Sequence, residues 1–156
     1  MKLFLMPILL GIGTLLPLSQ SQAAEPATKT YGGFEPGQTF SFTVTDKISN
    51  RTRGDDLTRN APVPSGVPDF DEGQTVNFVI GARGQLKGPG FSIKFRADEA
   101  DVNFYSNNRN SSRISGATAI VPKTHDDKPT DATLTFFRLR FSGFTPITHY
   151  VRYELE

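Results

Sequence analysis

Apolar and polar side chains alternate along much of the chain, most clearly in residues 132–156. Successive side chains of a β-strand point to opposite faces of its sheet, so a period of two is typical of a half-buried strand. The pattern predicts a C-terminal hairpin of two long strands that turns through residues 142–146. Its predicted core-facing set is Phe137, Leu139, Phe141, Ile147, Val151, Tyr153 and Leu155. Its predicted solvent-facing set is Arg138, Arg140, Thr148, Arg152 and Glu154.

Shorter alternating segments precede this hairpin, and glycine, proline or charged residues separate them. They predict strands at residues 38–46, 75–82, 91–97, 102–105 and 114–122. Residues 47–74 are rich in proline and glycine. We expect a short edge strand within residues 57–63 and an extended proline segment after it, because proline cannot donate to a sheet ladder. No segment after residue 23 has the spacing of an amphipathic helix.

About seven closely spaced strands without a helix indicate an all-β fold, either a sandwich or a barrel. One-sided alternation suits two sheets that each bury one face. The sequence therefore predicts a single immunoglobulin-like β-sandwich domain over residues 38–156, with a small β-barrel as the alternative. By strand count the domain resembles the immunoglobulin-like modules of exported bacterial proteins, a similarity at the level of fold.

The chain begins with the three parts of a secretory signal peptide. Lys2 gives a positive start, residues 3–18 are mostly apolar, and Ser21-Gln22-Ala23 fits the small-residue cleavage pattern. A membrane anchor is disfavoured because the apolar run is short and no basic stop signal follows it. We predict cleavage after Ala23, a flexible leader at residues 24–37, no membrane span after cleavage, and a secreted or periplasmic location.

Composition removes several classes of function. The chain has no cysteine, so thiol catalysis, thiolate metal sites and structural disulfides are excluded. It has 17 basic and 16 acidic side chains, and cleavage after Ala23 would remove one lysine and balance the two. A neutral chain argues against a general nucleic-acid binder, which normally carries a basic excess. With 13 Phe and no Trp, phenylalanine is expected to fill the core.

Basic side chains supply the candidate binding surface. On the predicted alternation they lie on outer faces of three strands, at Lys94, Arg96, Arg138, Arg140 and Arg152. If those strands are neighbours, they form a basic stripe that suits an acidic glycan or a phosphate. The competing interpretation is that these charges provide solubility and block edge pairing.

Catalytic and metal chemistry has little support in the sequence. The two histidines are His125, in a charged loop, and His149, on the inward side of the last strand. No G-x-S-x-G elbow accompanies them. Acidic clusters fall in predicted turns, where Asp caps its own backbone. Of these, the group Asp126, Asp127 and Asp131 is the candidate for calcium. We assign no catalytic residue, no metal ligand and no cofactor.

The C-terminus resembles that of a chaperone–usher pilin subunit, with Gly143 about fourteen residues from the end and Tyr153 close to it. The resemblance covers only the last strand, and the usual cysteine pair is absent. It implies assembly by strand exchange. The sequence as a whole predicts an exported, non-enzymatic binding or surface module whose partner is a glycan or another surface protein. The alternatives are a pilin-like assembly subunit and a small hydrolase or metal-dependent enzyme.

Overall fold

A computed structural model describes residues 29–97, 101–106, 114–122 and 129–156. This part of the chain contains nine strands and no helix. The strands are β1 (Thr39–Arg53), β2 (Asp56–Thr58), β3 (Thr75–Ile80), β4 (Gln85–Gly88), β5 (Phe91–Ala97), β6 (Asp101–Ser106), β7 (Gly116–Pro122), β8 (Ala132–Ser142) and β9 (Thr145–Leu155). Within the described ranges, no helix is long and apolar enough to span a membrane.

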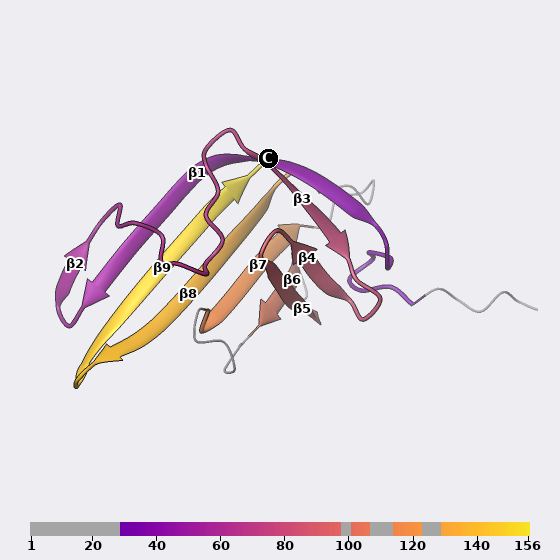
Figure 1. Cartoon of the computed structure of the whole chain (residues 1–156). Helices are drawn as coiled ribbons and strands as arrows, with labels where there is room; N and C mark the ends of the chain where they lie inside the picture. The colour runs from indigo at the N-terminus through magenta and orange to yellow at the C-terminus, as the bar shows by residue number, and fades with distance from the viewer. Residues whose placement is uncertain (1–28, 98–100, 107–113, 123–128) are drawn as a thin grey trace, which may run out of the picture.

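All pairings are antiparallel, and eight strands follow one another in the order β1-β3-β4-β5-β6-β7-β8-β9. β1 then pairs with β9, so the sheet returns to its first strand and forms a nearly closed barrel (Figure 1). β2 adds only a short hairpin to the far end of β1. The all-β prediction is confirmed, but the seven-strand immunoglobulin-like sandwich is corrected to the barrel-like arrangement given as its alternative.

Two strands make the corners of this barrel. Residues 39–43 of β1 pair with β3, whereas residues 44–53 pair with β9. In the same way, residues 91–94 of β5 pair with β4 and residues 95–97 pair with β6. Strands that pass from one side to the other join what would otherwise be two separate sheets. A sandwich prediction based on strand count alone does not detect such corners.

A β-bulge in β1 changes which side chains face inward. The register with β9 shifts between Val44, opposite Leu155, and Asp46, opposite Glu154, which leaves Thr45 as the extra residue. Before the bulge, Phe40, Phe42 and Val44 are buried; after it, the odd-numbered side chains face the interior, beginning with Lys47. A bulge adds one residue to one strand, so it reverses the phase of alternation beyond it. The sequence pattern therefore ends near Asp46 although the strand continues to Arg53.

Aromatic rings cross the barrel interior in a connected series. Phe42 contacts Phe78, Phe78 contacts Phe91, and Phe91 contacts Phe136, with ring centroids 5.5–5.7 Å apart. Edge-to-face and tilted contacts at such distances are the arrangement that aromatic quadrupoles favour. Phe34, from the segment predicted to be a flexible leader, is also buried and packs against Phe40. The prediction that phenylalanine fills the core is confirmed.

Candidate functional site

Three strands continue past the point where the barrel's other strands end. The last pair between β7 and β8 joins Gly116 to Phe137, but β8 continues to Ser142, and β1 and β9 run beside it. We call this part the extension: residues 50–53 of β1, 137–142 of β8 and 145–150 of β9. Figure 1 shows these three strands side by side, reaching away from β5, β6 and β7. The extension has two faces, which carry different side chains.

The inner face of the extension is continuous with the barrel interior and becomes basic along its length. Arg51 lies directly opposite His149, and His149 lies directly opposite Arg138, so the three form one row across β1, β9 and β8. Arg53, Ile147 and Arg140 form the next row outward. Directly opposed residues point to the same face, and neighbouring strands are about 4.8 Å apart. We call Arg51, His149, Arg138 and Arg140 the basic cluster.

No described carboxylate neutralises the basic cluster. The two ion pairs within the described residues are Lys47–Asp69 and Arg152–Glu154. Arg138 donates one hydrogen bond from Nη1 to the backbone oxygen of Ser65, 3.0 Å away, and this bond orients its guanidinium group. The positive charge of the cluster is therefore held in place but is not balanced by a neighbouring side chain.

His149 is the most enclosed member of the cluster, with 7% of its surface exposed. Burial lowers the pKa of its imidazole below the usual 6.5, and the positive charges of Arg140, Arg138 and Arg51 lower it further. His149 is therefore neutral at pH 7. Among the described residues, no group beside it resembles the orienting carboxylate of a catalytic triad.

Unpaired polar atoms concentrate on this face. Buried side-chain atoms without a hydrogen-bond partner, within the described residues, include Ser49 Oγ, Arg51 Nε, Arg138 Nε and His149 Nδ1. Ser49 is one row nearer the barrel than Arg51, on the same side of β1. The one other such atom among the described residues is Arg152 Nε, on the outer face. Buried polar groups in native proteins are almost always paired, so four unpaired atoms on adjacent side chains mark this part of the inner face.

The proline-rich segment of residues 59–70 crosses the inner face beside the basic cluster. Ala61 N donates to Ser49 O at 2.8 Å, and the Tyr153 hydroxyl donates to Pro68 O at 2.8 Å. The segment is thus hydrogen-bonded first to β1 and then to β9. Figure 1 shows it passing across these strands. Burial raises the pKa of Tyr153 to about 12, so this anchor stays protonated.

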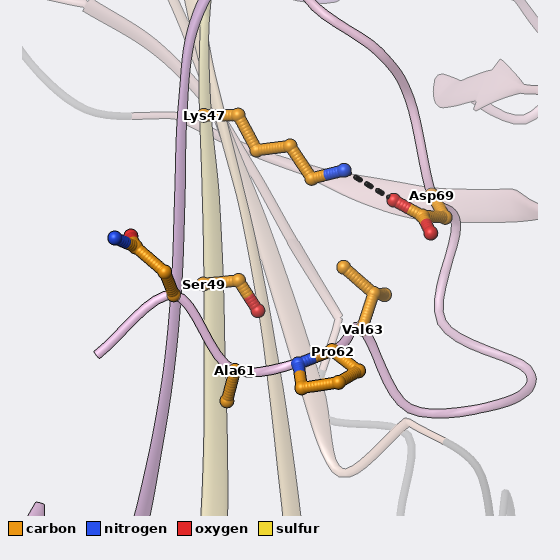
Figure 2. A pocket seen from close by; sticks show the side chains of 7 residues that line it. Lys47, Ser49, Ala61, Pro62, Val63 and Asp69 are labelled. Atoms are coloured by element: carbon orange, nitrogen blue, oxygen red, sulfur yellow. Dashed lines mark hydrogen bonds and ion pairs between the residues drawn. The ribbon is translucent and has the colours of Figure 1, made fainter. Parts of the chain in front are cut away.

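A pocket of about 330 Å³ lies between β1 and this segment. Its lining residues are Lys47, Ser49, Asn60, Ala61, Pro62, Val63 and Asp69. Figure 2 shows the Lys47–Asp69 ion pair closing one side and the Ser49 hydroxyl directed toward the proline segment. Lys47 Nζ and Asp69 Oδ1 are 2.6 Å apart. Because Ser49 adjoins Arg51 on the same face, the pocket and the basic cluster are neighbours.

The outer face of the extension is apolar. Leu57, Thr52, Thr148 and Leu139 form one row across β2, β1, β9 and β8. Asn50, Tyr150 and Phe137 form the next. Exposed fractions are 56% for Leu57, 41% for Leu139, 66% for Phe141, 37% for both Phe137 and Tyr150, and 104% for Phe144 at the tip of the hairpin. We call these six side chains the apolar face.

The structure separates the five basic residues of the predicted stripe. Lys94 and Arg96 are exposed on β5, which β6 and β7 separate from β8. Arg152 lies on the outer face of β9 and pairs with Glu154. Only Arg138 and Arg140 stay together. They lie on the inner face, so the predicted phase of β8 was wrong.

Arg51 and His149 complete the cluster. Arg51 was missed because the bulge interrupts the alternation, so the sequence pattern predicted that the first strand ends at residue 46.

The predicted calcium group is not described as a whole, because Asp126 and Asp127 lie outside the described residues and Asp131 is exposed. Within the described ranges, no three His, Asp or Glu side chains are close enough to hold a metal ion. His125 also lies outside the described residues. The chain matches no protein-family model, and searches of curated proteins and of solved structures found no significant match.

Proposed function

We propose that this chain is an exported, non-enzymatic binding protein that holds a protein partner on the apolar face of the extension. The observation that carries the proposal is that Phe137, Leu139, Phe141, Phe144 and Tyr150 are all exposed on one hairpin, whereas among the side chains described in the rest of the barrel only one large apolar residue, Ile120, is exposed to a similar degree. Contiguous exposed apolar surface of this kind commonly marks an interaction site. The N-terminal pattern of residues 1–23 supports export to the periplasm or the cell exterior.

The chemistry of the apolar face favours a protein over a glycan or a polyanion. Its two complete rows contain no charged side chain, and its largest members are phenylalanine, leucine and tyrosine. Centres of protein interfaces are enriched in aromatic residues and depleted of charge. The first charged side chain lies one row nearer the barrel, where Arg152 forms an ion pair with Glu154. A charged margin of this kind is expected at the polar rim of a protein interface.

Two alternatives have less support from the fold. Pilin-like strand exchange needs an unfilled strand position, but β9, the strand that resembles a pilin, has β1 and β8 of its own chain on its two sides. A hydrolase needs a general base beside a nucleophile or a metal. The buried histidine instead lies among arginines: burial and then these charges lower its pKa, and no described carboxylate orients it for proton transfer.

A photo-crosslinking amino acid in place of Phe144 tests the proposal in the source organism. Phe144 is fully exposed, so the replacement leaves the fold intact. We expect one discrete adduct, and we expect Leu139→Ser to remove it without lowering the melting temperature. The control carries the crosslinker at Arg83, an exposed turn residue between β3 and β4. Equal adducts from both positions, or an adduct indifferent to Leu139→Ser, would refute the proposal, and an adduct of twice the chain's mass would favour the assembly-subunit alternative.

A further inference from the structure

We propose that the basic cluster is a binding site for a doubly charged oxyanion, a phosphate or sulfate group. The site lies on the inner face of the extension, opposite the apolar face, and does not depend on the function proposed for that face. Its members are Arg51, His149 and Arg138 in one cross-strand row, and Arg140 in the next.

The spacing of the row suits a single small anion. With strands about 4.8 Å apart, the backbones of Arg51 and Arg138 are about 10 Å apart, with His149 between them. Arginine side chains on both sides can therefore converge on one tetrahedral group above the imidazole. Guanidinium groups present planar pairs of donors that match the oxygen spacing of phosphate, sulfate and carboxylate.

Charge selects a dianion over a carboxylate. Three guanidinium groups face the site, and none forms an ion pair with a described side chain. The nearest acid in register is Asp56, opposite Arg53 at the outer margin, and it forms no ion pair within the described residues. A monocarboxylate would leave most of the positive charge unbalanced, whereas phosphate or sulfate balances two of the three charges.

An independent observation points to a ligand at the same place. His149 is more than nine-tenths buried, and its Nδ1 has no hydrogen-bond partner within the described residues. The Nε atoms of Arg51 and Arg138 and the hydroxyl of Ser49 are also buried and unpaired there. Leaving such donors unpaired costs free energy, and an oxyanion that accepts from several of them removes that cost.

The site combines order with access. Arg138 is held by the Ser65 carbonyl, and Ser65 belongs to a segment that Tyr153 anchors to β9 through Pro68. Arg140 is exposed, so an anion reaches the cluster from the solvent side of the extension. Pre-positioned donors lose little conformational entropy when a ligand binds, which favours specific over diffuse binding of the anion.

Calorimetric titration with inorganic phosphate and inorganic sulfate, against chloride at equal ionic strength, tests the site. We expect both dianions to bind with saturation and to raise the melting temperature, and chloride to do neither. Arg51→Gln and Arg140→Gln should each weaken phosphate binding about tenfold or more, because each removes a charged hydrogen-bond donor. Lys94→Gln, an exposed lysine on the other side of the barrel, is the matched control and should change the affinity less than about twofold.

Equal responses to phosphate and chloride would overturn the proposal, as would equal losses from Lys94→Gln and Arg140→Gln. Arg140 is exposed and forms no ion pair with a described side chain, so its variant keeps the test valid if Arg51→Gln destabilises the fold. Glucose 6-phosphate distinguishes the source of the group. Tighter binding than inorganic phosphate identifies a phosphate ester as the ligand type, and equal binding identifies the free ion.

Discussion

Single side chains connect the proline-rich segment to the barrel. The Tyr153 side chain is fully buried; its hydroxyl donates to Pro68 O and accepts from Phe70 N at 3.3 Å. Its ring also packs on Phe70, with centroids 5.1 Å apart. One residue thus satisfies two backbone groups that would otherwise be buried without partners.

Tyr153→Phe should lower the free energy of unfolding by about 1–3 kcal/mol, because it leaves the Pro68 carbonyl and the Phe70 amide unpaired while keeping the ring. Urea denaturation measures the change. Tyr150→Phe is the control, since Tyr150 is partly exposed on the outer face and should change stability by less than about 0.5 kcal/mol. Equal effects of the two substitutions would contradict the anchoring role of Tyr153.

His149 should make the protein less stable in mild acid. Its folded pKa lies below 6.5, so the unfolded chain takes up a proton at a higher pH than the folded chain does. Stability from this group is complete above the unfolded pKa and is lost as pH falls below about 6.5 and through the lower folded pKa. The charged groups around it are Arg51, Arg53 and the Lys47–Asp69 pair, with Asp56 on β2 and Arg138 and Arg140 on β8.

Urea titrations above and below pH 6.5 measure the loss, and His149→Gln, which cannot titrate, should lose less stability than the wild type. Saturating sulfate, which stays doubly charged in mild acid, should reduce the loss in the wild type alone, because a bound anion favours the protonated imidazole. A variant that loses as much as the wild type would show that other groups control the acid response.

At the scale of elements, β8 explains where sequence-based prediction succeeded and where it failed. The hairpin, its turn and the inward positions of β9 were predicted correctly, including buried His149 and Tyr153. The phase of β8 was not, because Phe136 and Phe137 are adjacent and either can begin an apolar series. Inside the barrel the inner residues are apolar, but in the extension they are Arg138 and Arg140. The apolar side chains of the extension, Phe137, Leu139 and Phe141, lie on the outer face. The alternation across the whole strand follows these residues, so the sequence pattern assigned the outer face to the core.

The phase of β8 can be tested with neighbouring residues. Phe136→Ala should cost about 3–5 kcal/mol of unfolding free energy, because its ring is buried within the barrel. Phe137→Ala should cost less than half as much, since its side chain lies on the outer face and is 37% exposed. Chemical denaturation of both variants gives the comparison, and a larger loss for Phe137→Ala would mean that the predicted phase was correct after all.

At the scale of the whole molecule, closure depends on pairing between residues far apart in the chain. The first long strand pairs with the last, and no local pattern in either strand encodes that contact. Strand existence was therefore predictable, but the corners at β1 and β5, the short β4 and the barrel closure were not. The basic cluster was equally hidden, since Arg51 and His149 become neighbours only through this pairing.

Amide hydrogen exchange should separate the barrel from the extension. Residues 133–137 of β8 have strand partners on both sides, whereas residues 138–142 pair with β9 alone, apart from the Leu139 amide, which donates to Ser115 Oγ. Peptides covering 138–144 should exchange faster than those covering 132–137, because edge strands open with a smaller local free energy. Uniform exchange along β8 would show that the extension is as protected as the barrel.

The bulge at Thr45 decides to which of two surfaces the end of β1 contributes each side chain. The same residues in a strand without the bulge would alternate regularly from Val44, and would present Ile48, Asn50 and Thr52 on the side where Ser49, Arg51 and Arg53 now lie. Loss of Thr45 itself would remove the bulge but leave Asp46 opposite Glu154, so the arginines would keep their side. We therefore expect descendants of this gene that lack Thr45 to retain both surfaces, although the residue belongs to neither.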